Sequence, residues 1–178
     1  MQPVPDRPQS PIDDPFALLG LDRSFRIDQP ALQRAWLQRT AALHPDRHPD
    51  PVQAASLLSR VNRAKSVLED PEQRANALLV LLGGPAREQD KSLPDGFLTG
   101  MMEARQEAEE ALHSADAPAL ERWKQWARDE RENYHRQTAA LFDRAVSDGA
   151  APDTLRQLRA TLNAWRYIER MIEQLSET

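Results

Sequence analysis

The tripeptide His-Pro-Asp occurs twice in this chain, at residues 44–46 and 48–50, and carries its most specific chemistry. Imidazole and carboxylate groups bind metal ions, but two histidines four residues apart converge on one ion only when both stand on a helix. A proline follows each histidine and excludes a helix there. The chain also has no cysteine. We therefore expect no metal site in this segment.

The other chemistry open to the tripeptide is docking onto a partner protein. Proline fixes the backbone, so the ring of His44 and the carboxylate of Asp46 are presented at a defined separation, and a carboxylate pairs well with an arginine of a partner. The first copy directly follows Leu43 and precedes the basic Arg47. The second has a structural explanation, because Asp50 precedes a proline and is expected to cap the next helix. We assign the docking role to the first copy.

Four helices are predicted around this loop. Asp-Pro pairs at 14–15, 50–51 and 70–71, and Asp28 two residues before a proline, mark helix starts, since aspartate accepts hydrogen bonds from the first-turn amides. Apolar residues recur behind these starts at helical intervals, and no segment alternates with the period of a strand. The markers are Phe16 and Leu19; Leu32, Trp36, Leu37 and Leu43; Leu57, Val61, Ala64 and Leu68; and Leu78 to Leu82.

Three longer helices are predicted in the second part of the chain. One begins near Asp95, the next runs from Asp116 to a stop at Gly149, and the last opens at Pro152. Two long amphipathic helices joined by a short turn must lie antiparallel, and a third packed on them makes a three-helix bundle. The fold class is therefore all-α, a helical hairpin with a His-Pro-Asp loop followed by a three-helix bundle. The indoles expected in the cores are those of Trp36, Trp123 and Trp165.

Composition divides the 178 residues into modules. Prolines fill residues 1–12, which we expect to be a disordered tail, and Gly-Gly-Pro opens a segment of little apolar content at 83–94, which we expect to be a linker. Residues 13–82 and 95–178 are then the two domains. Residues 1–82 carry ten basic and ten acidic side chains, whereas 83–178 carry thirteen and eighteen. The net charge of -5 comes from the second part.

Several classes of function are excluded by this composition. An acidic chain lacks the basic surface that nucleic acids require, and no apolar run approaches the roughly 20 residues that span a bilayer. There is no nucleophile elbow, no glycine-rich phosphate loop and no carboxylate pair beside a base, so we expect no enzyme and no cofactor. The absence of cysteine fits a reducing compartment, and we expect a cytoplasmic protein.

Several stretches of the sequence resemble a known family. The stretches DPFALLGL, LHPDR and NRAKSVLEDPEQRA look like a J-domain, and RANALLVLLGG followed by FLTGMMEARQEAEE looks like the HscB family of iron–sulphur co-chaperones. The resemblance covers residues 13–176. It implies a monomeric co-chaperone with two partners, a dedicated HscA-like Hsp70 and the IscU-like scaffold on which iron–sulphur clusters are built. The implied process is iron–sulphur cluster assembly, with protein complex oligomerization as a further expected role.

The resemblance also implies which residues meet each partner. The Hsp70, on which ATP hydrolysis occurs, is expected to be contacted and activated by His44, Pro45, Asp46 and Arg47 in the loop, with Arg34 and Arg39 on the helix before it. The scaffold is expected to be bound by Leu98, Met102, Glu103, Arg105 and Gln106 on the first helix of the bundle and by Tyr167 on the last.

The physical pattern of the scaffold surface supports part of this assignment. An apolar stripe of Phe97, Met101 and Ala104 already supplies that helix with a buried face, which leaves Leu98 and Met102 on a neighbouring face. Tyr167 is equally explained as a packed aromatic, and Arg34 and Arg39 as a solvated helix face. The chain departs from the family at Thr99 and Gln106 and carries Gly100 inside the helix. These departures concern the strength of scaffold binding.

Two other functions remain open from the sequence. The chain could be a structural helical adaptor that never touches an Hsp70, or a J-domain protein whose bundle carries a different client. Changing His44 to Gln tests the first alternative, because an adaptor that never touches an Hsp70 would keep every activity. Titration with the scaffold tests the second, because a J-domain protein with a different client would show no saturable binding to it.

Overall fold

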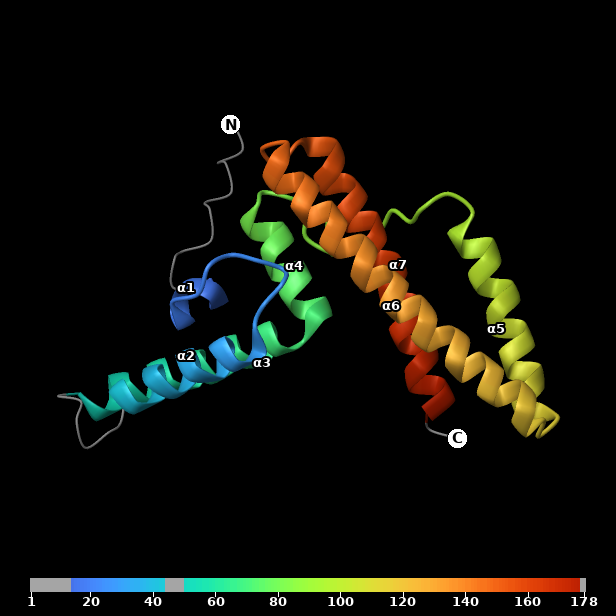
Figure 1. Ribbon diagram of the computed structural model, residues 1–178, viewed down its shortest axis with the longest axis horizontal. Coiled ribbons are helices and arrows are strands. Elements are labelled where there is room, and N and C mark those ends of the chain that lie inside the picture. The colour runs from blue at the N-terminus through green and yellow to red at the C-terminus, as the bar shows by residue number, and fades with distance from the viewer. Residues whose placement is uncertain (1–13, 44–49, 177–178) are drawn as a thin grey trace, which may run out of the picture. The chain divides into compact units, whose positions relative to one another are not determined.

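The computed structural model describes residues 14–43 and 50–176, which form helices and no strand (Figure 1). The all-α prediction is confirmed. The chain divides into two compact units between residues 82 and 83. The helices are α1 (Pro15–Leu19), α2 (Gln29–Ala42), α3 (Pro51–Glu69) and α4 (Pro71–Leu81) in the first unit, and α5 (Phe97–His113), α6 (Ala117–Ser147) and α7 (Pro152–Ser176) in the second.

Aspartate caps begin the helices of the first unit, as the sequence predicts. Asp14 accepts from the amides of residues 16 and 17 at 2.9 and 3.2 Å, Asp28 from residue 31 at 3.2 Å, and Asp70 from residue 73 at 3.0 Å. Asp50 accepts from the amides of residues 52 and 53, both at 3.0 Å. The structural explanation for the last residue of the second tripeptide is therefore confirmed.

Helix α3 is the centre of the first unit. It contacts α1, α2 and α4, and α2 lies beside it (Figure 1). Its buried face meets buried side chains of the other helices; the core contains Phe16, Leu19, Leu32, Val61, Ala64, Leu68, Leu78 and Leu79. Trp36 is only half-buried, so its assignment to the core was wrong. Its indole N–H donates to Asn62 Oδ1 at 2.8 Å, and the Lys65 ammonium lies 5.0 Å from its ring centroid, so polar neighbours hold it at the edge of the α2–α3 contact.

The buried arginine of the RANALL stretch ties the first unit together. Arg74 is 4% exposed, and its guanidinium donates to two main-chain carbonyl oxygens, that of Phe25 at 2.8 Å and that of Leu68. It also lies 5.3 Å from the centroid of the Phe25 ring. Burial lowers the pKa of Arg74, with Asp70 opposing the shift. One side chain thus joins α4 to the end of α3 and to the segment before α2.

Replacing Arg74 with Ala should destabilise the first unit by about 3 kcal/mol, because two buried carbonyls lose their donors and a cavity is left. Arg74→Lys should recover only part of this, since a single ammonium lacks the fork that reaches both oxygens. Arg63→Ala, at an exposed position on α3, is the matched control and should change stability by less than about 0.5 kcal/mol. Hydrogen exchange of the α3 and α4 amides in increasing urea measures this unit separately. Equal stability of the two alanine variants would contradict the role given to Arg74.

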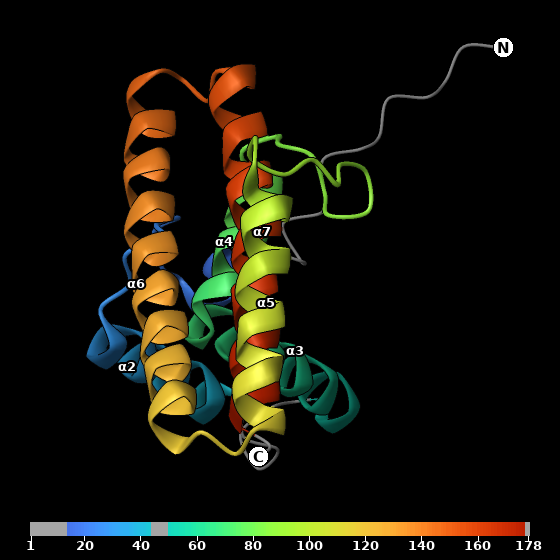
Figure 2. The ribbon, with the colours of Figure 1, turned by 90° about the vertical axis from the view of Figure 1, so that its right-hand side faces the viewer.

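The second unit is a three-helix bundle, as predicted. Helices α6 and α7 pack along each other after a short turn, and α5 contacts both (Figure 2). An ion pair joins α6 to α7: the Arg131 guanidinium donates two hydrogen bonds to the Glu169 carboxylate, from Nε at 2.9 Å and from Nη2 at 2.7 Å. The core includes Ala108, Ala127, Phe142, Leu158, Leu162, Trp165 and Ile168. Trp165 is 2% exposed as expected, whereas Trp123 is half-buried and stacks edge-to-face with Trp126 at 5.3 Å, which corrects its assignment to the core.

Helix α5 starts near Asp95, as predicted, but its cap is the next residue. Its N-cap is Gly96, with φ of 72° and no side-chain hydrogen bond, and the helix begins at Phe97. A positive φ is accessible to glycine without a steric cost, so the chain turns into the helix at this residue and not at the aspartate before it.

The buried phenol of Tyr134 leads us to predict a loss of stability at alkaline pH. Burial, and secondarily the nearby Glu130, raise the pKa of Tyr134 from 10.0 to about 12. The unfolded phenol therefore ionises first, and the free energy of unfolding should fall by about 2 kcal/mol as pH rises from the unfolded to the folded pKa. Denaturant unfolding of Tyr134→Phe and the parent across this range measures the difference. Because the two proteins differ only at residue 134, an identical alkaline decline in the two would contradict the prediction.

Candidate functional site

The predicted Hsp70-docking loop falls between two packed helices. Its residues His44, Pro45, Asp46 and Arg47 lie outside the described part of the chain. On one side α2 ends at Ala42, and on the other α3 begins at Pro51 behind its Asp50 cap. Helices α2 and α3 contact each other, so the loop residues connect two packed helices.

The structure does not bring Arg34 and Arg39 together on one face. Five helical residues rotate by about 140°, so the two side chains leave α2 in different directions. Arg34 is exposed and forms an ion pair with Asp28 at 3.7 Å. The Arg39 guanidinium lies over the end of α1, where a β-carbon at Gly20 would be 3.1 Å from Nη2.

An exposed leucine on α2 was missed as a candidate binding residue. Leu37 was expected on the apolar side of this helix, but its exposed fraction is 51%. The reason is geometric, because Leu32 and Trp36 are one turn apart whereas Leu37 is rotated by about 100° from Trp36. Leu37 is instead a neighbour of Arg34, three residues before it. An arginine and an apolar side chain thus share the outer face of α2.

The predicted scaffold surface is exposed on α5. Leu98 is 50% and Met102 65% exposed, whereas Met101, Ala104 and Ala108 of the same helix are buried. The expectation that the first two lie outside the core is confirmed. Their four-residue spacing places them side by side, and three polar side chains surround them, namely Glu103, Arg105 and Gln106, all exposed. Arg105 Nε donates to Glu109 Oε1 at 2.8 Å.

Tyr167 of α7 belongs to the same region of the bundle. Its ring packs edge-on against Phe97 at 5.6 Å, and Phe97 also meets Tyr134 at 6.3 Å. Tyr167 nevertheless keeps 37% of its surface exposed, so it is both packed and accessible. Phe97 adjoins Leu98 in the chain and therefore connects Tyr167 to the start of the α5 surface. We call Leu98, Met102 and Tyr167 the apolar patch.

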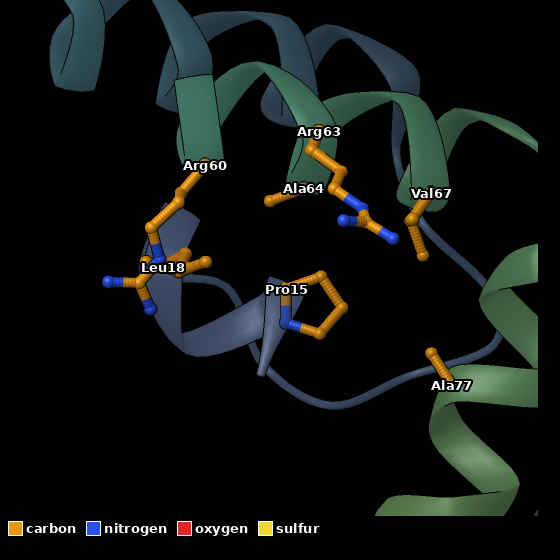
Figure 3. A pocket seen from close by; sticks show the side chains of 7 residues that line it. All are labelled: Pro15, Leu18, Arg60, Arg63, Ala64, Val67 and Ala77. Carbon is orange, nitrogen blue, oxygen red and sulfur yellow. The ribbon is translucent and has the colours of Figure 1, made fainter. Parts of the chain in front are cut away.

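The first unit contains a half-open pocket of about 360 Å³. Figure 3 shows Arg60 and Arg63 leaving α3 towards Pro15 and Leu18 of α1. Ala64, Val67 and Ala77 complete the lining. These groups can contact an anion or an apolar surface, but none is a carboxylate, imidazole, hydroxyl or thiol. The pocket therefore offers no general base or nucleophile.

Neither a metal centre nor a membrane span is found in the described ranges. Across residues 14–43 and 50–176, no three His, Asp or Glu side chains are grouped to hold an ion. None of the helices described combines the length and the apolar character needed to cross a bilayer.

Comparison with known proteins identifies both units. Residues 14–77 match the DnaJ domain family, and residues 93–176 match the HSCB C-terminal oligomerisation domain. A co-chaperone protein HscB homolog from Azoarcus sp. is 33% identical over 168 residues, covering 91% of this chain and 95% of the relative. The homolog from Ralstonia nicotianae is 30% identical and covers 93% and 97%. The chain belongs to the HscB co-chaperone family.

Solved HscB structures share the fold. The chaperone HscB from Vibrio cholerae matches with a TM-score of 0.65 and 27% identity, covering 91% of this chain and 99% of that one. Human co-chaperone HscB matches with a TM-score of 0.76 at 23% identity, covering 99% and 84%, a likeness that concerns the fold. The predicted family and the arrangement of a J-domain followed by a helical bundle are thereby confirmed.

Proposed function

We propose that this HscB-family chain stimulates ATP hydrolysis by a dedicated, HscA-like Hsp70 and delivers an IscU-like iron–sulphur scaffold to it. The observation that carries the proposal is that one chain joins a DnaJ domain to an HSCB C-terminal domain, with an exposed apolar patch on the latter. The outcome for the cell is assistance in the maturation of iron–sulphur proteins. We place the protein in the cytoplasm as a monomer.

The J-domain acts through docking, since hydrolysis takes place on the chaperone. The loop residues His44, Pro45, Asp46 and Arg47 provide the specific contact. Arg34 and the exposed Leu37 on α2 supply a charged and an apolar group on a single face, whereas Arg39 contributes from another side of the helix. Exposed charges of this kind accelerate encounter more than they add affinity, so stimulation should weaken as salt rises.

The bundle acts as the scaffold receptor. When a partner covers apolar side chains that are exposed in the free protein, their burial favours binding, and a polar rim sets the orientation of the partner. The apolar patch and its rim of Glu103, Arg105 and Gln106 have this composition. Because the chain holds both partners, it raises the local concentration of the scaffold at the chaperone.

Steady-state ATP hydrolysis by the Hsp70 of the same organism tests the proposal. The chain alone should raise the rate, the scaffold alone should raise it less, and the two together should exceed the sum of the separate effects. No stimulation under any condition would favour the structural adaptor. Stimulation without any contribution from the scaffold, and without saturable binding to it, would favour a J-domain protein with another client.

A further inference from the structure

A basic pocket lies beside Tyr167 of the apolar patch, within the second unit. It has a volume of about 170 Å³ and is lined by Arg87, Lys91, Arg166 and Arg170, together with Leu93, Asn163 and Tyr167. None of the lining residues is acidic. This concentration of positive charge stands out in a unit that carries thirteen basic against eighteen acidic side chains.

The pocket is built by hydrogen bonds that anchor the 83–96 segment to α7. The buried Arg159 donates from Nε to the carbonyl of Pro85 at 3.1 Å. Asn163 donates from Nδ2 to the carbonyls of Asp90 at 3.0 Å and Ser92 at 2.9 Å. The segment is therefore fixed at both ends of the stretch that carries Arg87 and Lys91, and these two cations are held against α7.

Helix α7 supplies the opposite wall as a single stripe. Asn163, Arg166, Tyr167 and Arg170 follow the three- and four-residue spacing that places side chains on one helix face. Arg166 pairs with Glu173 at 3.5 Å. Within the described residues, the side chains of Arg87, Lys91 and Arg170 have no ion pair or hydrogen-bond partner. Three cations held close together without ion pairs of their own repel one another, and this repulsion is relieved when an anion enters.

The volume of the basic pocket indicates which kind of anion it can hold. Pockets for drug-sized ligands and cofactors measure about 300 Å³ or more, and this one is about half that size. It suits the carboxylate groups of side chains that a larger partner inserts. Tyr167 lines this pocket, and its ring also packs against Phe97, the residue before Leu98, so it joins the pocket to the start of α5.

We propose that this basic pocket receives an acidic segment of the iron–sulphur scaffold while the neighbouring apolar patch binds the scaffold's hydrophobic surface. The inference rests on the proposed function, because the same partner occupies both surfaces. The pocket fixes the orientation of the scaffold and speeds its approach to an otherwise acidic bundle, which would repel acidic side chains elsewhere.

Neutralising two of the cations tests the proposal in the full-length chain. Lys91→Gln with Arg170→Gln leaves Arg159 and Asn163 in place, so the anchored segment stays folded. Calorimetric titration with the scaffold at an ionic strength of about 50 mM should give binding about fivefold weaker than that of the parent. At about 300 mM the difference should shrink to less than about twofold, because screening removes the contribution of exposed charges. The control, Arg122→Gln with Arg144→Gln on α6, changes the net charge equally and should bind like the parent at both salt concentrations.

The outcomes separate this inference from the function on which it rests. If the parent chain does not bind the scaffold, both fail. If the parent binds and the Lys91→Gln, Arg170→Gln variant binds equally well at low salt, the inference alone is overturned. Equal weakening by the α6 control would also overturn it, because net charge would then explain the effect. A separate titration with inorganic phosphate tests whether the pocket is a site for free anions. If the parent binds phosphate saturably, and the Lys91→Gln, Arg170→Gln variant binds the scaffold as tightly as the parent, the inference is overturned.

Discussion

A chain carrying His44→Gln should fail to stimulate the ATPase of its Hsp70 while still binding the scaffold. His44 lies in the stretch between α2 and α3, which contact each other. In a small docking contact of the kind we propose, a single side chain contributes a large share of the binding free energy. Glutamine retains polarity and approximate size but lacks the aromatic ring. Loss of such an interface residue costs about 2 kcal/mol or more, which corresponds to a roughly 30-fold weaker stimulation at limiting co-chaperone.

The chain provides its own control for this experiment at the second tripeptide. His48→Gln makes the same chemical change four residues away, and the docking role has been assigned to the first copy. The His48 variant should therefore stimulate the Hsp70 as the parent does. If the two variants lose activity equally, the assignment of the first copy is wrong. If neither loses activity, the J-domain does not act through this loop, and the adaptor interpretation gains support.

Local sequence signals predicted the helices well because their causes are local. An aspartate that caps a helix needs only the amides of the next few residues, and all four Asp signals of the first unit act in this way. The start of α5 is the exception, where the turn depends on the positive φ of Gly96 and not on Asp95. The exposed position of Leu98 and Met102 was also predictable, since the neighbouring stripe of the same helix already filled the core.

Contacts between residues far apart in sequence were not predictable in this way. Arg74 reaches a carbonyl 49 residues away and Arg159 one 74 residues away, and nothing beside either arginine in the sequence indicates its partner. Their burial contradicts the general tendency of arginine to be exposed, and only the tertiary arrangement of acceptors explains it. The basic pocket has the same origin, because its two walls come from residues 87–93 and 163–170.

Aromatic residues on apolar stripes were the least reliable indicators of the core. Trp36 and Trp123 follow helical spacing and yet are half-buried. An indole is large enough to cover the edge of a helix contact, and the N–H of Trp36 stays on a polar partner, Asn62. Phe97 likewise sits between Tyr134 and Tyr167 at the margin of the bundle. Periodicity identifies the side of a helix that packs, but the number of neighbouring helices determines how far each side chain is covered.

Changing both Leu98 and Met102 to Ala should remove most of the affinity for the scaffold without destabilising the bundle. Both side chains are at least half exposed, so the free energy of unfolding should change by less than about 0.5 kcal/mol. In a complex they would be covered, and truncation of two adjacent apolar anchors costs about 3 kcal/mol, or roughly 100-fold in Kd. Calorimetric titration of the scaffold measures the affinity, and thermal unfolding measures the stability.

A matched variant separates loss of the patch from a general loss of exposed apolar surface. Val146 is 79% exposed on α6 of the same unit, and Val146→Ala should leave scaffold binding unchanged. Binding that survives the Leu98→Ala, Met102→Ala change would retain the scaffold as the client and move its contact elsewhere on the bundle. Because the double variant keeps the loop between α2 and α3, it should still stimulate the Hsp70 when the scaffold is absent. Retained ATPase stimulation by this variant, set beside retained scaffold binding by His44→Gln, would establish that the two units meet their partners independently.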